Sequence, residues 1–223
     1  MPSALVIGAS RGIGREFVRQ LLHDGWKVYA TARDAAGLDE LRATGAEALK
    51  LDVAKPESLA GLGWQLDGVK LDLALYVAGV LGPQQGADEP PAGADFDAVM
   101  HTNVLGAMQA MPLIAPLVEA AYGKFVFITS GMGSIAEASS SGAWWIYRVS
   151  KAALNMAVKS GAFDYPKATF IAMCPGWVRT DMGGPSAEIS VEQCVSDIRR
   201  VLEKLSLKDS GSYHNHAGRH LPW

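Results

Sequence analysis

A tyrosine and a lysine stand four residues apart in the stretch WWIYRVSKAALN, which runs from Trp144 to Asn155. Residues at this spacing share one face of a helix, so Lys151 can lie close to Tyr147. A nearby ammonium group favours the phenolate and lowers the pKa of a tyrosine below its ordinary value of about 10. Such a pair can exchange a proton with the oxygen of a carbonyl or alcohol. The alternative is a solvated pair on an exposed helix.

A serine hydroxyl follows the apolar run KFVFIT directly, at Ser130. Ligands of open α/β sheets bind at the carboxyl ends of the strands, where this serine is expected. Its hydroxyl can hydrogen-bond a substrate carbonyl and stabilise the developing oxyanion. Ser134, four residues later, is the alternative for this role.

The stretch VIGASRGIG carries Gly8, Gly12 and Gly14 between an apolar strand pattern and a helix pattern. Glycines let the backbone turn tightly and approach a pyrophosphate, and a helix N-terminus offers free N–H groups. We therefore expect a dinucleotide site here, with a plain strand-to-helix turn as the alternative.

The end of the second predicted strand indicates which dinucleotide binds. An NAD site carries an acid there to hold the ribose diol, but this chain has Ala32, followed by Arg33. Arg11 lies in the glycine turn, and two arginines suit a 2′-phosphate. The pattern favours NADP(H). Asp34, one residue further along, keeps NAD(H) as the alternative, and Arg33 could equally be a solvated surface charge.

Apolar runs of strand length alternate with helix-like stretches, which predicts a parallel sheet covered on both faces. Strands are expected at residues 4–9, 27–32, 46–53, 71–79, 124–130, 169–176 and within 211–216. Helices are expected at residues 15–23, 35–44, 56–66, 95–122, 147–163 and 191–205. Residues 82–93 are expected to form a surface loop. The sequence thus predicts one doubly wound α/β domain of the Rossmann type over residues 1–223.

Composition limits the classes of protein to consider. The 223 residues are 49% hydrophobic and 19% charged, with a net charge of -3, which indicates a folded chain with a sizeable core. No basic block marks a nucleic-acid surface, and the apolar runs are too short to span a bilayer. The N-terminus runs straight into a strand pattern, and Cys174 and Cys194 make no disulfide framework. We expect a soluble cytoplasmic protein with a small-molecule substrate and no nucleic-acid or membrane partner.

The motifs follow one another in the order typical of one enzyme family. The motifs are GASRGIG, LDV at 51–53, AG at 78–79, TNV at 102–104, ITS at 128–130, YRVSK at 147–151 and CPGWVRTDM at 174–182. Over nearly its whole length the chain resembles the short-chain dehydrogenases/reductases. The stretch YRVSKAALN, the short segment after PGWVRTDMGG and the LPW ending resemble a narrower group, the sniffer and C-factor-like carbonyl reductases.

This resemblance implies a catalytic group of Ser130, Tyr147, Lys151 and Asn103. Tyr147 would be the acid/base, and Lys151 would tune it and hold the nicotinamide ribose. Asn103 would help to hold a water that connects to the lysine, with a hydrogen bond to its local backbone as the alternative. The other cofactor contacts implied are Gly8, Ser10, Arg11, Gly12, Ile13, Gly14, Arg33, Asp52, Val53, Ala78, Gly79, Pro175, Gly176, Val178 and Thr180.

Trp177 and Met182 are expected in the substrate pocket, because they flank the presumed nicotinamide segment, with core or interface positions as the alternative. The chain departs from the family pattern at Val77, where relatives often have an asparagine, which questions local rigidity more than catalysis.

Three histidines gather in YHNHAGRH without a cysteine or acid at a recognised metal-ligand spacing. We predict a surface turn rather than a metal site there. Cys174 is expected to be a small core residue rather than a nucleophile.

These features predict an NADPH-dependent carbonyl reductase, or the reverse alcohol dehydrogenase, for a small or medium hydrophobic ketone or aldehyde. The C-factor resemblance motivates an alternative, a cofactor-bound signalling or regulatory protein with weak reductase activity. The helix-like stretches 95–122 and 147–163 resemble the family's interface pair and predict a homodimer or homotetramer.

Overall fold

A computed structural model describes residues 1–139 and 142–223, and a seven-stranded parallel sheet forms its centre. The strands are β1 (Ser3–Ile7), β2 (Lys27–Ala32), β3 (Glu47–Lys50), β4 (Leu73–Tyr76), β5 (Lys124–Ile128), β6 (Thr169–Cys174) and β7 (Ser212–Asn215). Their order in the sheet is β3-β2-β1-β4-β5-β6-β7, and every neighbouring pair is parallel. The winding direction therefore reverses between β1 and β4, which is where such sheets bind ligands. The predicted doubly wound fold is confirmed.

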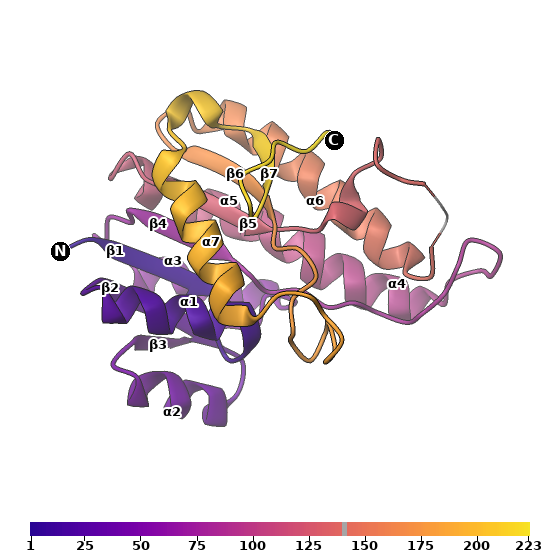
Figure 1. Ribbon diagram of the computed structural model, residues 1–223. Coiled ribbons are helices and arrows are strands. Elements are labelled where there is room, and N and C mark those ends of the chain that lie inside the picture. Colours follow the sequence, from indigo (N-terminus) through magenta and orange to yellow (C-terminus); the bar gives the residue numbers. More distant parts are fainter. Residues whose placement is uncertain (140–141) are drawn as a thin grey trace.

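Helices cover both faces of the sheet (Figure 1). They are α1 (Gly12–His23), α2 (Ala35–Ala43), α3 (Pro56–Gln65), α4 (Gly93–Met100), α5 (Gly106–Glu119), α6 (Trp145–Asp164) and α7 (Val191–Lys204). Successive side chains of a strand point to opposite faces. Ala4 and Val6 of β1 accordingly pack in the cluster that α1, α2 and α7 cover, and Leu5 and Ile7 pack beneath α3, α5 and α6. Each face of the sheet thus has its own apolar core.

The prediction of one regular helix over residues 95–122 is wrong, and the interruption matters for the site. The structure divides this stretch into α4, a π-helical turn η1 (His101–Leu105) and α5. A π-helical turn interrupts the regular register of a helix and is often found at functional sites. Here it carries Asn103, which is fully buried.

The other predicted elements lie where the sequence places them, with differences at their ends. The first helix begins at Gly12 rather than at residue 15, and β3 and β4 are shorter than the apolar runs that contain them. In the described part of the chain, no helix is long and apolar enough to cross a membrane.

Candidate active site

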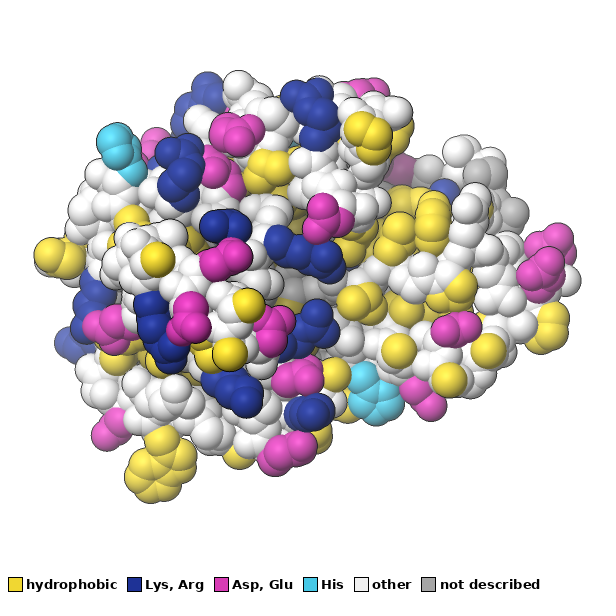
Figure 2. Space-filling view, turned by 90° about the horizontal axis from the view of Figure 1, so that it is seen from below, with side chains coloured by type: hydrophobic (Ala, Val, Ile, Leu, Met, Phe, Trp, Pro, Cys, Tyr) yellow, Lys and Arg dark blue, Asp and Glu magenta, His cyan; other side chains and the backbone are white. Residues whose placement is uncertain are grey.

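A cavity of about 450 Å³ is lined by residues at the carboxyl ends of the first six strands. Its lining includes both the turn between β1 and α1 and the side chains of Tyr147 and Lys151 of α6. Figure 2 shows Lys and Arg side chains over the left and centre of one face, and a group of hydrophobic side chains to the right of the centre. The cavity likewise has a basic part and an apolar part. Arginines line it near the glycine turn, and apolar residues such as Val80 and Met182 also line it.

The turn between β1 and α1 accepts only glycine at two positions. Gly8 has a φ of +88°, and a Cβ there would lie 2.7 Å from the backbone nitrogen of Ala78. A Cβ on Gly14 would lie 2.1 Å from the carbonyl oxygen of Gly8. The hydroxyl of Thr31 accepts a hydrogen bond from the Gly8 N–H at 3.0 Å and fixes the turn against β2. The tight turn and the adjacent N-terminus of α1 fit a pyrophosphate group.

Two arginines line the cavity near this turn. Arg33 is exposed and follows the buried Ala32 at the end of β2. The Arg11 guanidinium lies 3.0 Å from the carboxylate of Asp181, and both side chains are largely exposed. Asp34 has a different role from the one considered for NAD, because its carboxylate accepts a hydrogen bond from the Gly37 N–H at 2.8 Å and caps α2.

Tyr147 and Lys151 form a buried pair on one face of α6. Their exposed fractions are 7% and 3%, so the alternative of a solvated surface pair is wrong. The Nζ of Lys151 lies 5.5 Å from the centroid of the Tyr147 ring. It also donates a hydrogen bond of 3.0 Å to the carbonyl oxygen of Ile128, at the end of β5. The helix thus presents both groups to the cavity beside the middle of the sheet.

Burial dominates the acid–base properties of this pair. It raises the pKa of Tyr147 to about 12, against a hydrogen bond with Ser130 that lowers it. It lowers the pKa of Lys151 to about 8. The lowered pKa of Tyr147 that the sequence pattern predicts is thus not found in the protein alone, because burial outweighs the hydrogen bond with Ser130.

The serine that faces Tyr147 is Ser130. It follows β5, and its Oγ accepts a hydrogen bond from the Met132 N–H at 3.2 Å besides bonding to the tyrosine. Ser134 is 3% exposed, and its hydroxyl donates to the carbonyl of Pro222 at 2.7 Å. That bond commits the hydroxyl of Ser134 to a distant backbone group, so the geometry favours Ser130.

Asn103 connects the loop after β4 to helix α6. Its Oδ1 accepts from the Val80 N–H at 2.8 Å, and its Nδ2 donates to the Val80 carbonyl and to Ser150 Oγ, each at 2.9 Å. The alternative of a hydrogen bond to its own local backbone is thus wrong. Ser150 in turn donates to the carbonyl of Tyr147 at 2.8 Å. A Cβ on Gly79 would lie 3.3 Å from the Asn103 oxygen and 3.5 Å from the Lys151 nitrogen, so Gly79 leaves room for both.

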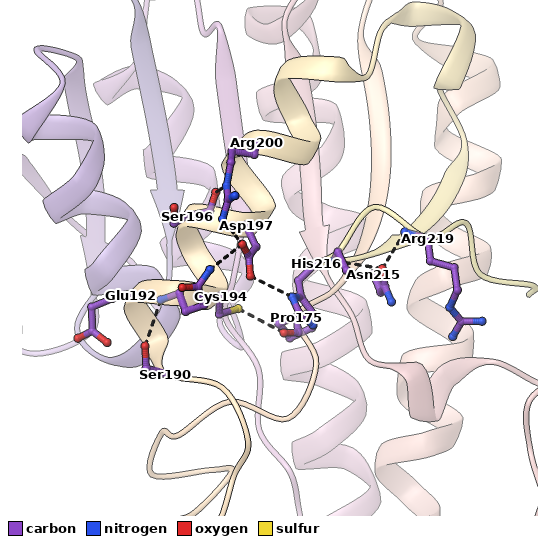
Figure 3. Close-up of polar contacts among 12 residues, drawn as sticks. Pro175, Ser190, Glu192, Cys194, Ser196, Asp197, Arg200, Asn215, His216 and Arg219 are labelled. Atoms are coloured by element: carbon purple, nitrogen blue, oxygen red, sulfur yellow. Dashed lines mark hydrogen bonds and ion pairs between the residues drawn. The ribbon is translucent and has the colours of Figure 1, made fainter.

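The turn after β6 is held from behind by α7 and β7 (Figure 3). The thiol of Cys194 donates to the carbonyl of Pro175 at 3.3 Å, and the His216 N–H donates to the carbonyl of Cys174 at 2.9 Å. Gly176 has a φ of +80°, and a Cβ there would lie 2.9 Å from the His216 ring. This packing fixes the turn along the cavity wall.

Most of the sequence-predicted site residues line the cavity. They are Gly8, Ser10, Arg11, Gly12, Ile13, Arg33, Asp52, Val53, Ala78, Gly79, Tyr147, Lys151, Pro175, Thr180 and Met182. Gly14, Asn103, Ser130, Gly176 and Val178 adjoin it through the contacts or chain neighbours given above. The described lining does not include Trp177, whose ring is half exposed and donates to the Gly183 carbonyl at 2.8 Å. A pocket position for Trp177 therefore stays a prediction.

Sequence reasoning missed several polar residues of the site, among them Thr31, Ser150 and Arg179. Thr31 fixes the glycine turn, Ser150 joins Asn103 to α6, and Arg179 lines the cavity. Ser150 lies three residues after Tyr147 inside the YRVSK motif, and that spacing was the signal that it shares the tyrosine's helix face. Arg179 lies between Val178 and Thr180, which were predicted site residues, and Thr31 precedes Ala32 at the end of β2, so their places in the sequence were also signals.

The histidine-rich stretch forms the end of β7 and then a turn at residues 216–218, which confirms the predicted turn near the final strand. His214 is a residue of β7 with an exposed fraction of 8%, and its ring packs edge-on against His220 at 5.2 Å. His216 lies 3.5 Å from the carboxylate of Asp197. Across residues 1–139 and 142–223, no group of three or more His, Cys, Asp or Glu could hold a metal ion.

The cavity brings together a glycine turn, a Tyr–Lys pair and an adjacent serine. Most of the chain also matches one protein family. Residues 2–189 match the model of the short chain dehydrogenase family. The chain belongs to the short-chain dehydrogenases. This confirms the predicted family, which is a family of oxidoreductases.

Three relatives illustrate where the chain lies within the short-chain dehydrogenases. C-signal of Myxococcus xanthus is 38% identical over 133 residues, which are 58% of this chain and 80% of that protein. The structure of NADPH-bound carbonyl reductase from chicken fatty liver is 31% identical, with a TM-score of 0.90 over 100% of this chain and 99% of that one. The carbonyl reductase Sniffer of D. melanogaster is 27% identical, with a TM-score of 0.91 over all of both chains. The predicted resemblance to the sniffer and C-factor-like group is thus confirmed.

Proposed function

We propose that this short-chain dehydrogenase is an NADPH-dependent carbonyl reductase, which also runs in reverse as an alcohol dehydrogenase. One observation carries the proposal. The buried pair Tyr147 and Lys151 lies in the same cavity as a glycine turn that fits a dinucleotide pyrophosphate. A proton donor and a hydride-donor site in one cavity are what carbonyl reduction requires.

NADPH, when bound, supplies the hydride that reduces the carbonyl carbon. The protein's own residues stabilise and protonate the carbonyl oxygen of the substrate. The Ser130 hydroxyl donates a hydrogen bond to the substrate oxygen and stabilises the charge that develops on it. Tyr147 transfers its phenolic proton to that oxygen, so the substrate leaves as a neutral alcohol. The ammonium group of Lys151 stabilises the phenolate that remains.

The cofactor preference rests on the arginines near the glycine turn. Arg11 and Arg33 line the cavity, and Ala32 stands where an NAD site would carry an acid. The chicken relative is a carbonyl reductase bound to NADPH, and its likeness to this chain supports the same choice here. Asp34 is engaged as a helix cap, which weakens the argument for NAD.

The substrate we propose is a small or medium hydrophobic ketone or aldehyde. The cavity beside Tyr147 is lined by apolar groups that include Val80 and Met182, and these favour an apolar substrate body. We also infer that residues 1–223 act as one domain, because the cavity draws on residues from the first strand to the seventh helix. We also propose that this reductase acts in the cytoplasm.

A homodimer or homotetramer remains our proposal for the assembly. Helices α5 and α6 expose Met108, Met156 and Phe163, whose exposed fractions are 51%, 66% and 75%. Apolar side chains exposed on neighbouring helices favour coverage by a second protein surface. Light scattering at micromolar concentration tests this, and a monomer would contradict it.

The second candidate is a cofactor-bound regulatory protein, which the 38% identity to C-signal favours. A Tyr147→Phe protein that still performs the cellular task would support this candidate over the reductase.

A thermal-shift titration with NADPH and NADH side by side tests the cofactor first. A ligand at a hundred times its dissociation constant adds about 2.7 kcal/mol to the free energy of unfolding. We expect a clear rise in Tm with NADPH and a smaller one with NADH. A larger rise in Tm with NADH would contradict the NADP(H) preference. No rise with either cofactor would contradict the proposal that the protein is a reductase.

A further inference from the structure

The backbone of Ser130 is held from behind by a buried tyrosine of the last strand. Tyr213 lies in β7, has no exposed surface, and donates its hydroxyl proton to the carbonyl of Ser130 at 2.6 Å. The ring of Trp223 stacks on the Tyr213 ring with a centroid distance of 5.3 Å and an angle of 18°. The Leu221 N–H donates to the Tyr213 carbonyl at 2.8 Å. Trp223 therefore restrains the ring that restrains Ser130.

Residues 219–223, which we call the clamp segment, also bond directly to the loop 130–137. Its backbone accepts hydrogen bonds from that loop, from Ser134 Oγ to the Pro222 carbonyl at 2.7 Å and to the Trp223 carbonyl at 3.4 Å, and from the Ala136 N–H to the Trp223 carbonyl at 2.9 Å. Arg219 pairs with Glu137 at 2.9 Å. Figure 3 shows the Arg219 side chain turned away from Asp197 and His216. The clamp segment and the loop thus lie side by side.

Asn155 of α6 donates from its Nδ2 to the Gly133 carbonyl of this loop at 3.3 Å. Two further hydrogen bonds of Ser130 itself are local. Its Oγ accepts from the Met132 N–H, and its carbonyl accepts from the Gly133 N–H at 2.9 Å. These bonds move with the loop. Two contacts tie the loop to neighbouring strands near Ser130, namely the Tyr213 hydroxyl and the thiol of Cys174, which accepts from the Gly131 N–H at 3.0 Å.

We propose that Tyr213 and the clamp segment position Ser130 for catalysis, by fixing its hydroxyl against the hydroxyl of Tyr147. This inference rests on the proposed reductase function. Tyr213 acts through Ser130 and is a positioning residue. Removing its hydroxyl releases the Ser130 carbonyl, and removing the Trp223 ring lets the Tyr213 ring tilt. Neither change affects the glycine turn, which follows β1, four strands away from β7 in the sheet.

Hydrogen–deuterium exchange tests the clamp without any substrate. We expect the amides of loop 130–137 to exchange roughly 10-fold faster in Tyr213→Phe and in Trp223→Ala, with β1 and β2 unchanged. Trp223→Phe keeps a ring for stacking and should restore most of the protection. Tyr165→Phe is the matched control, because Tyr165 stacks on Phe170 at the far end of α6. Unchanged exchange in both clamp variants would overturn the proposal.

Kinetics with 4-nitrobenzaldehyde and NADPH, and with 4-nitrobenzyl alcohol and NADP⁺, test the positioning role. In Tyr213→Phe we expect kcat to fall roughly 10-fold while KM for NADPH changes less than about 2-fold. The midpoint of the pH profile for alcohol oxidation should rise, because the Ser130 hydrogen bond lowers the pKa of Tyr147 and is loosened. Lys151 and Cys174 also face Tyr147 and are the same in both proteins.

Two results separate this proposal from the reductase itself. A lower kcat with an unchanged pH midpoint would mean a loss of active protein and would overturn the positioning role. A wild-type protein that turns over neither probe would contradict the proposed reductase function. The exchange experiment would still show whether Tyr213 and the clamp segment restrain the loop 130–137.

Discussion

Asn103 donates a hydrogen bond of 2.9 Å to Ser150, and this bond joins the π-helical turn between α4 and α5 to the first turns of α6. Ser150 passes the link on to the carbonyl of Tyr147 at 2.8 Å. Both Asn103 and Ser150 have no exposed surface. Buried polar networks of this kind hold side chains in one arrangement, because an unpaired member would be costly. The link therefore sets the position of α6 relative to β4.

Breaking this link should affect both stability and activity. Ser150→Ala leaves the Asn103 amide one partner short, which should lower the free energy of unfolding by about 1–3 kcal/mol. We also expect a lower kcat, because Tyr147 loses a backbone restraint. Urea denaturation and steady-state kinetics measure the two effects. Ser160→Ala on the exposed side of the same helix is the control. Equal stability of the two variants would contradict the role of Ser150.

Replacing the proposed acid tests the mechanism directly. Tyr147→Phe removes the phenolic proton but keeps the ring, so we expect carbonyl reduction to fall by roughly 10²–10⁴-fold. The cofactor should still bind with nearly unchanged affinity, because the glycine turn and the arginines are intact. Turnover assays and NADPH titration by fluorescence measure both quantities. Full activity of this variant would refute the proposed role of Tyr147.

The sequence predicted the sheet, the family and most of the cavity lining, because these depend on local patterns. A strand pattern followed by glycines and a helix can be recognised without knowing the rest of the fold. The position of Tyr147 and Lys151 on one helix face follows in the same way from their four-residue spacing.

The properties that were wrong or missed depend on tertiary contacts. The pKa of Tyr147 depends on how deeply α6 packs, and the sequence pattern does not report that depth. Trp177 is absent from the cavity lining, and its ring turns to the Gly183 carbonyl, a contact that the sequence does not signal. Tyr213 meets Ser130 across a separation of 83 residues, and nothing in YHNHAGRH signals that contact.

The cofactor preference should change when an arginine is removed. Arg33→Ala is expected to weaken NADPH binding by roughly 10-fold or more and to leave NADH binding within about 2-fold, because only NADPH carries the 2′-phosphate. Isothermal titration with each cofactor measures the ratio. Arg42→Ala is the control, since Arg42 is an exposed arginine of α2 that pairs with Asp39 instead of lining the cavity. Equal losses for both cofactors would contradict a 2′-phosphate contact.

The burial of Lys151 should cost stability in a pH-dependent way. Its pKa falls from the ordinary 10.5 to about 8 on folding, so below pH 8 the folded protein buries a charged amine at full cost. Between about pH 8 and 10.5 the unfolded chain binds more protons than the folded one, so the free energy of unfolding rises with pH through this window. Above it both states are neutral at this residue, and the cost is gone.

Lys151→Met removes this cost and should stabilise the protein while abolishing activity. The gain at pH 7 is at most about 3 kcal/mol, less about 1 kcal/mol for the lost hydrogen bond to the Ile128 carbonyl. The advantage of the variant over the wild type should shrink from pH 8 to 10.5, and denaturation at several pH values measures it. Lys159→Met is the control, because Lys159 also donates to a carbonyl, that of Gly211 at 3.1 Å, but is only partly buried. If the stability of Lys151→Met and of the wild type changed in parallel with pH, the burial cost assigned to Lys151 would be wrong.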